Sequence, residues 1–151
     1  MPKGRRMTLP IIKLQKMYDD VILPTYATDG SVGFDIHAYS YFMLRSGETA
    51  MVTTGLRVQI PKNTELTVRQ RSGISKTFPN YIAIGIGTID FDYRGQILIP
   101  VVNNANMDFI ISKGMRIAQC VLSPIIQPTI QFTDKLDDTE RGQSGFGSTG
   151  A

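Results

Sequence analysis

The sequence predicts an all-β fold of the sandwich or jelly-roll type, and two features of its pattern support this. Apolar residues alternate with polar ones in four short runs, and such alternation buries one face of a strand while solvent covers the other. The 14 glycines and 8 prolines are spread along the chain, where they bound these runs as turn residues do. The four alternating sets are Leu56, Val58 and Ile60; Leu66 and Val68; Ile97 and Ile99; and Ile130 and Phe132.

Helical periodicity is rare in this sequence. The range 72–78 could form one short helical turn, and the range 11–17 fits neither a strand nor a helix clearly. At 151 residues, the chain is long enough for one domain with a buried core. We therefore expect a single all-β domain over residues 1–140, followed by a flexible C-terminal arm over residues 141–151.

Composition excludes several classes of protein. Cys120 and His37 are each alone of their type, which rules out an internal disulfide framework and a cysteine-built zinc site. No apolar stretch is long enough to span a membrane and no signal-peptide pattern opens the chain, so we expect an intracellular protein, cytoplasmic or nuclear. The net charge is +3, but no long basic run occurs, so we expect no direct nucleic-acid binding. A mild positive balance also suits a binder of a multiply charged phosphate ligand.

The first candidate site lies in the strand-like range 33–38, where Asp35 follows a glycine and a phenylalanine. Asp35 could serve phosphate-bound magnesium, a hard cation that prefers oxygen ligands and keeps several waters. It could equally bond backbone in a loop. His37 lies two residues further along the same strand face, and we interpret it as a solvent-facing or structural histidine and not as a catalyst.

Two further segments carry weaker signals. The range 71–73, Arg-Ser-Gly, offers a planar guanidinium for phosphate oxygens, a hydroxyl, and a glycine that lets a ligand touch the backbone. A surface turn would explain the same three residues. The range 114–122 indicates a turn that enters a buried strand, which the polar residues Arg116 and Gln119 interrupt.

The range 87–95, Gly-Thr-Ile-Asp-Phe-Asp-Tyr-Arg-Gly, is more informative. Strand-like runs at residues 81–86 and 96–102 flank it, which predicts a hairpin around a tight acidic and aromatic turn.

Asp90 is the candidate general base within this turn. It follows Ile86 and Ile89, an apolar pair that would hold its carboxylate near a partly dry pocket. A carboxylate there could orient a water molecule and accept its proton. Ordinary turn chemistry would also explain Asp90, and a core or cross-strand position would explain Tyr93.

The range 141–151 has one large apolar residue, Phe146, among glycines and serines. Such a segment should be mobile unless something outside it supplies contacts. An arm that closes over a ligand would use Phe146 to stack, Arg141 to pair with phosphate and the glycines for close approach. A disordered tail is the alternative.

Together and in this order, these segments resemble the five-motif pattern of the trimeric deoxyuridine triphosphatases (dUTPases). The motifs correspond to residues 31–38, 71–75, 87–95, 114–122 and 141–150. The third and fifth motifs are the specific ones.

The resemblance implies a jelly-roll subunit of the β-clip type that forms a homotrimer, with each active site drawing on all three chains. It implies hydrolysis of dUTP to dUMP and pyrophosphate by attack of water on the α-phosphate. That reaction would limit uracil incorporation into DNA and supply dUMP for dTMP synthesis. Mg²⁺ is the implied cofactor, which Asp35 would reach through water.

The resemblance also implies a role for each candidate residue. Asp90 would be the general base, and Tyr93 would pack against the deoxyribose and leave no room for a 2′-hydroxyl. Phe146 would stack on the base, and Arg141 would meet the γ-phosphate as the arm closes. The other substrate-binding residues would be Arg71, Ser72, Gly73 and Gln119 at the phosphates, Ile84, Gly87, Thr88 and Ile89 around uracil, and Gly147 and Ser148 in the arm.

The sequence also departs from the family pattern. Ile84 stands where some members place an asparagine that helps read uracil, so recognition there must rest on backbone or water. Gln70, Met115 and Ser144 replace residues that are common in the family.

Three alternatives remain at this point. A dCTP deaminase would need a glutamate placed to activate water at the cytosine ring, and the third motif has none. A dUTPase-like subunit that mainly binds a protein partner, with arm closure as a nucleotide-controlled switch, stays open. A purely structural jelly roll would leave the tail and the acidic hairpin unexplained.

Overall fold

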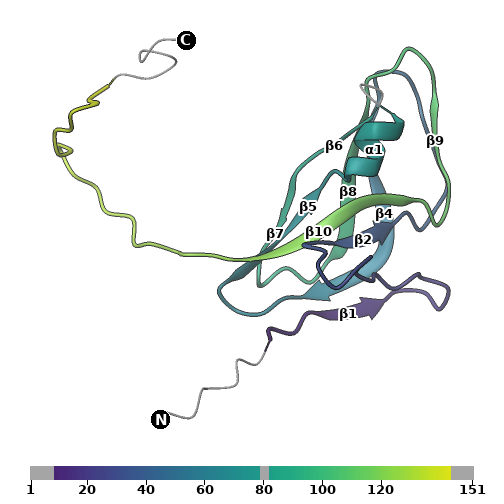
Figure 1. Cartoon of the computed structure of the whole chain (residues 1–151), viewed down its shortest axis with the longest axis horizontal. Coiled ribbons are helices and arrows are strands. Elements are labelled where there is room, and N and C mark those ends of the chain that lie inside the picture. The colour runs from purple at the N-terminus through teal and green to yellow at the C-terminus, as the bar shows by residue number, and fades with distance from the viewer. Residues whose placement is uncertain (1–8, 79–81, 144–151) are drawn as a thin grey trace.

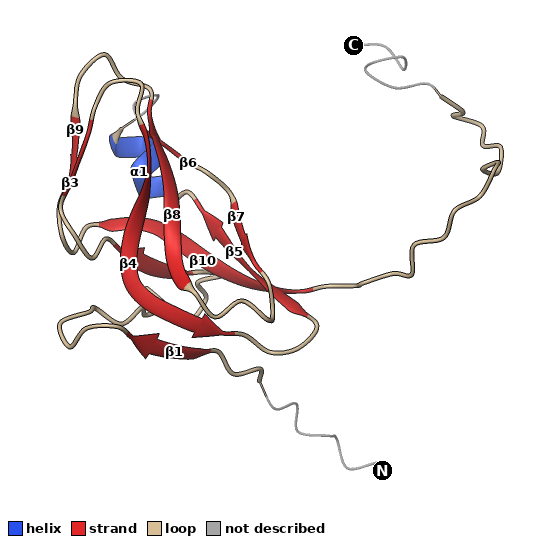
Figure 2. Cartoon of the chain, turned by 180° about the vertical axis from the view of Figure 1, so that it is seen from behind, coloured by secondary structure: helices blue, strands red, loops and turns tan. Residues whose placement is uncertain are grey.

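The computed structural model describes residues 9–78 and 82–143, which form a β-sandwich and an extended C-terminal segment (Figures 1 and 2). The all-β jelly-roll prediction is confirmed. The elements are β1 (Lys13–Lys16), β2 (Phe34–His37), β3 (Phe42–Leu44), β4 (Thr49–Gln59), β5 (Thr64–Arg69), α1 (Ser72–Thr77), β6 (Ile82–Ile84), β7 (Gly87–Ile89), β8 (Gln96–Asn103), β9 (Phe109–Ile111) and β10 (Arg116–Pro124).

Within the described residues, the strands form two four-stranded sheets and a two-stranded ribbon. The first sheet has the order β1-β4-β8-β6, the second has the order β2-β10-β5-β7, and β3 pairs with β9. All of these pairings are antiparallel. Because β10 lies between β2 and β5, segments that are distant in sequence become neighbours, and Asp35 faces Gln119 across the ladder.

The core lies between the two sheets and follows the alternation of the sequence. Along β8, every second residue is buried, including Ile97, Ile99 and Val101. Burying a side chain of this size contributes about 1.5–3 kcal/mol. Three of the four alternating sets are therefore confirmed, and their buried members are Leu56, Val58, Ile60, Leu66, Val68, Ile97 and Ile99.

The fourth set is wrong as a predicted strand. Ile130 and Phe132 are 84% and 95% exposed, and neither belongs to a strand. The last strand ends at Pro124, and the chain then runs away from the sandwich (Figure 1). A strand needs a neighbour for its backbone N–H and C=O groups, and none of the described strands lies beside this segment. Alternation alone does not reveal that lack.

The predicted hairpin around residues 87–95 is partly confirmed. Strands β6 and β8 pair as expected, with Ile84 opposite Val101. The connection between them is longer than a tight turn, because β7 crosses to the other sheet and pairs with β5. The third motif therefore starts in β7, an edge strand of the second sheet, and leads to β8, an inner strand of the first.

The two ambiguous segments are also settled. The range 72–78 contains α1, as predicted, and Ile74 is the buried residue of this helix. The range 11–17 contains β1, which pairs with β4. In the ranges that the structure describes, no helix has the length and apolar character that a membrane span requires.

Residues 125–143 form an extended, exposed segment without helix or strand. Figures 1 and 2 show it leading away from the sandwich after β10. The last described strand thus ends at Pro124, ahead of residue 140, where the sequence suggested the boundary between domain and arm.

Candidate active site

The first and second motifs meet at an ion pair. Arg71 donates from Nε to Oδ1 of Asp35 at 2.7 Å, and both side chains are largely shielded from solvent. Arg116 donates from Nη1 to Oδ2 of the same carboxylate at 3.4 Å. Asp35 is therefore held between two guanidinium groups, and it fixes the orientation of Arg71.

Asp35 and Arg71 border a cavity of about 200 Å³, which we call the phosphate cavity. Its lining joins the first, second and fourth motifs, as the resemblance implied. One wall is close-packed, because a Cβ atom on Gly33 would lie 2.9 Å from the carbonyl oxygen of Cys120 and 3.1 Å from Gln119 Oε1. The lining residues are Ala27, Ser31, Val32, Gly33, Asp35, Arg71, Ser72 and Gln119.

The loop that carries Arg71 and Ser72 is fixed from two sides. Arg71 is the N-cap of α1, and its carbonyl oxygen accepts from Ile74 N at 3.1 Å. Gln119 donates from Nε2 to the carbonyl oxygen of Gln70 at 2.9 Å, which ties β10 to the same loop. Gly73 lies beside the Arg71 guanidinium, with its ideal Cβ position 3.7 Å from Nη1.

The third motif borders a second cavity of about 240 Å³, which we call the hairpin cavity. Asp90 lies on its rim and is exposed. Tyr93 donates from its hydroxyl to the carbonyl oxygen of Gln96 at 2.8 Å, and this fold-back requires Gly95, where a Cβ atom would overlap the tyrosine hydroxyl. The lining residues are Met51, Val68, Gly87, Thr88, Ile89, Asp90, Tyr93, Gln96, Ile97, Leu98 and Pro100.

Two predicted features of the hairpin cavity differ in the structure. Ile86 is 79% exposed, so the expectation that Ile86 and Ile89 together shield Asp90 is wrong for the isolated chain. Ile89 is buried and lines the cavity as expected. The side chain of Ile84 lies in the core and does not line the cavity, because β6 turns it inward to face the other sheet.

The two cavities share no lining residue. Asp90 and Tyr93 belong to one, whereas Arg71, Ser72, Gln119 and Asp35 belong to the other. A single chain therefore presents the two groups of site residues separately. Among the residues that the structure describes, no cluster of three or more His, Cys, Asp or Glu side chains could hold a metal ion by itself.

Arg116 is the site residue that the sequence left without a role. Its contact with Asp35 follows from the register, because Arg116 lies opposite His37 across the ladder between β2 and β10. The sequence showed a basic residue at the start of this strand, but it did not show the partner of Arg116.

His37 lies next to the same group of charges. Burial lowers the pKa of His37, and the carboxylate of Asp35 opposes that shift. The Nδ1 atom of His37 is buried without a hydrogen-bond partner among the described residues.

Cys120 and Arg141 line neither cavity. Burial raises the pKa of the Cys120 thiol to about 12, which removes it as a nucleophile at neutral pH. Arg141 lies in an exposed turn in which Gly142 N donates to the carbonyl oxygen of Thr139 at 3.1 Å. Phe146, Gly147 and Ser148 lie outside the described residues.

The fold and the two cavities define the class of protein: a small jelly-roll protein with a guanidinium-lined cavity and a second cavity that has an aspartate on its rim. Residues 19–150 match the dUTPase family. The chain belongs to that family.

Known relatives agree with this assignment. A deoxyuridine 5'-triphosphate nucleotidohydrolase of Crocosphaera subtropica is 40% identical over 139 residues, which cover 92% of this chain and 98% of that protein. One of the same description from Nautilia profundicola is 39% identical over the same shares of the two chains. The dUTPase of Staphylococcus bacteriophage 80alpha, solved with dUPNHPP, superposes with a TM-score of 0.86 at 25% identity, covering 93% of this chain and 99% of that one.

Proposed function

We propose that this chain hydrolyses dUTP to dUMP and pyrophosphate by attack of water on the α-phosphate. Family membership and relatives named as deoxyuridine 5'-triphosphate nucleotidohydrolases support the reaction. The main structural support is that the motif residues line two different cavities, the phosphate cavity beside Arg71 and the hairpin cavity beside Asp90. The reaction limits uracil incorporation into DNA and supplies dUMP for dTMP synthesis.

Asp90 is the general base in this proposal. Its position on the rim of the hairpin cavity allows its carboxylate to face a bound nucleotide and to orient the attacking water. Tyr93, whose ring is held against Gly95, offers a flat surface to the deoxyribose. Backbone groups of Gly87, Thr88 and Ile89 read uracil, and buried polar groups left unpaired by cytosine would reject that base.

The phosphate cavity supplies the positive charge. Arg71, held in place by Asp35, presents its remaining N–H groups to phosphate oxygens, and Ser72 and Gln119 add neutral donors. These groups stabilise charge that moves onto the leaving pyrophosphate. Arg116 adds a second guanidinium at the exposed side of Asp35.

Magnesium would bind at this site only together with the nucleotide. One carboxylate between two guanidinium groups does not form a metal site, so the phosphate oxygens would supply the direct ligands and Asp35 would hold the ion through a water molecule. When bound, Mg²⁺ neutralises charge on the triphosphate. A related structure, a mutant dUTPase from phage phi11 of S. aureus, coordinates a structural Mg(II) ion.

The active protein is a homotrimer in which the phosphate cavity of one chain faces the hairpin cavity of another. The separation of the two cavities within one chain supports this arrangement. It also explains the exposure of Ile86 and of Asp90, which lie at opposite ends of β7, because a neighbouring chain would cover both.

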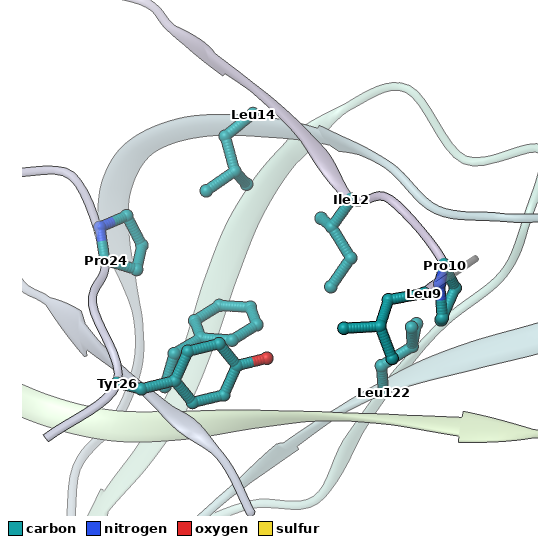
Figure 3. A pocket seen from close by; sticks show the side chains of 8 residues that line it. Leu9, Pro10, Ile12, Leu14, Pro24, Tyr26 and Leu122 are labelled. Carbon is teal, nitrogen blue, oxygen red and sulfur yellow. The ribbon is translucent and has the colours of Figure 1, made fainter. Parts of the chain in front are cut away.

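An apolar groove of about 510 Å³ supports the same assembly (Figure 3). It lies between β1 and β2, which are the outer strands of the two sheets. The extended segment after β10 carries exposed apolar side chains that match the groove in character, and in the trimer this segment of a second copy fills it. The groove is lined by Leu9, Pro10, Ile12, Leu14, Pro24, Tyr26, Phe34 and Leu122, and the exposed side chains are Ile126, Ile130, Phe132 and Leu136.

The arm at residues 141–151 completes the site after substrate binds. Arg141 pairs with the γ-phosphate, Phe146 stacks on the base, and Gly147 and Ser148 approach the nucleotide through their backbone. Deleting residues 141–151 should abolish turnover and leave the trimer intact. Normal hydrolysis by the truncated chain would contradict this role.

One assay tests the reaction. Purified full-length protein is incubated with each deoxynucleoside triphosphate and with UTP in the presence of magnesium, and released pyrophosphate is measured. We expect release from dUTP and little from dTTP, dCTP or UTP. Ammonia released from dCTP would favour a deaminase, and no release from any nucleotide would favour a binding or regulatory subunit.

A further inference from the structure

Gln70 connects three parts of the site through its side chain and its backbone. Its side-chain Oε1 accepts from the backbone N of Ile84 at 3.0 Å, and its Nε2 donates to Ser75 Oγ at 2.8 Å. Its carbonyl oxygen accepts from Gln119 Nε2 at 2.9 Å. One residue therefore contacts β6, α1 and β10 at the start of the loop that carries Arg71.

The hydrogen bond between Gln70 and Ile84 pairs a backbone N–H group at the edge of a sheet. In its sheet, β6 is an outer strand, and Gly85 N donates inward to the carbonyl oxygen of Pro100 on β8. Backbone N–H groups alternate in direction along a strand, so Ile84 N–H points away from β8 toward the open edge. Gln70 pairs this group, which would otherwise lie unpaired beside the hairpin cavity.

We infer that Gln70 is a positioning residue for dUTP hydrolysis. It fixes the position of the uracil-binding hairpin at Ile84 relative to the phosphate-binding loop at Arg71. The inference rests on the proposed function. Gln70 lines neither cavity, and it acts through residues 84–89 on one side and residues 71–75 on the other. Because Ile84 N–H already pairs with Gln70, this group is not available to bind the base.

The test compares Gln70→Met, which keeps the length of the side chain but removes its hydrogen bonds, with Ser75→Ala. The second variant removes the bond from Gln70 to α1 and the 3.5 Å bond from Ser75 Oγ to the carbonyl oxygen of Arg71, but it keeps the bond from Ile84 N to Gln70. A hydrogen bond contributes about 0.5–1.5 kcal/mol, so we expect Gln70→Met to raise the KM for dUTP about three- to tenfold and to change kcat much less. The ratio of kcat/KM for dUTP to that for dCTP should fall, because the hairpin is no longer fixed. Ser75→Ala should leave that ratio unchanged.

A second measurement is independent of activity. Amide hydrogen exchange at Ile84 in the full-length protein should accelerate in Gln70→Met and return to the wild-type rate in Gln70→Glu, which keeps an acceptor for this N–H. Unchanged exchange in Gln70→Met would overturn the inference, and so would faster exchange with an unchanged KM and nucleotide ratio. If the wild-type protein released no pyrophosphate from dUTP, the proposed function would fail, and exchange at Ile84 would still decide whether the link exists.

Discussion

The phosphate cavity and the hairpin cavity differ in how much of each site one chain completes. In the phosphate cavity, Arg71 and Asp35 are paired and shielded, and Gln119 ties their loop to β10. At the hairpin cavity, Asp90 is exposed on the rim, and Ile86, at the other end of β7, is also exposed. Charged groups that bind a charged ligand can be organised by ion pairs within one chain. A base that needs a dry pocket requires a cover, which the described residues of one chain do not supply at Asp90.

The largest effect is expected at the hairpin cavity. Asp90→Asn keeps the shape of the side chain but removes the proton acceptor, so kcat should fall about 10²- to 10⁴-fold while dUTP still binds. Asp92→Asn is the matched control, because Asp92 is an exposed aspartate of the same turn that does not line the cavity. Steady-state pyrophosphate release and equilibrium binding measure the two effects. Equal losses in the two variants would show that the turn needs its charge and not a specific base.

The second prediction asks whether the two cavities belong to different chains. Asp90→Asn and Arg71→Ala should each be inactive as pure proteins. If each site takes Asp90 from one chain and Arg71 from another, refolding the two variants together should restore roughly a quarter of the wild-type activity. Mixing should restore nothing if both residues of a site come from one chain, because every site would then carry one defect. The control is each variant refolded alone.

The third prediction concerns the role of Asp35. Asp35→Ala removes the acceptor that orients Arg71 and should raise the KM for dUTP about tenfold. Asp35→Asn should have a smaller effect, because its amide oxygen still accepts from Arg71 Nε. Both variants should need more magnesium than the wild type if Asp35 contacts a metal-bound water. If both variants needed no more magnesium than the wild type, the role of Asp35 would be only to orient Arg71.

Most of the fold was predictable because burial imposes a short-range pattern. Alternation identified Leu56, Leu66 and Ile97 as inward-facing, but it failed at Phe132, where the pattern is present and the partner strand is not. A strand partner is a long-range property, and alternation within one segment does not encode it.

Within the site, the sequence identified residue types but not their contacts. Arg71 and Asp35 were both candidates, yet their ion pair depends on β10 lying between β2 and β5, where Gln119 is opposite both Asp35 and Arg69. The link from Gln70 to Ile84 likewise depends on an edge strand that comes next to a loop from the other sheet. The five-motif resemblance suggested roles for these residues, which the local pattern of the sequence could not do.

The smallest effect is expected at Asp20, which provides a control for the ion pair at Asp35. Asp20 also binds a cation, Lys113, and accepts from the Tyr39 hydroxyl at 3.0 Å, but its side chain is 59% exposed, against 18% for Asp35. Solvent screens exposed pairs, so Asp20→Asn should leave KM unchanged and reduce stability only slightly.

The stabilising effect of Asp20 should depend on pH. The hydrogen bonds from Lys113 and Tyr39 lower the pKa of Asp20 below its ordinary 3.8, so this carboxylate stabilises the fold above that pH. As the pH falls below 3.8, the unfolded chain takes up the proton first, and the contribution is lost once the pH passes the folded pKa and both states are protonated. Urea unfolding of wild type and variant should therefore differ at neutral pH and converge below the folded pKa. A difference that persisted there would show that Asp20 acts through packing and not through charge.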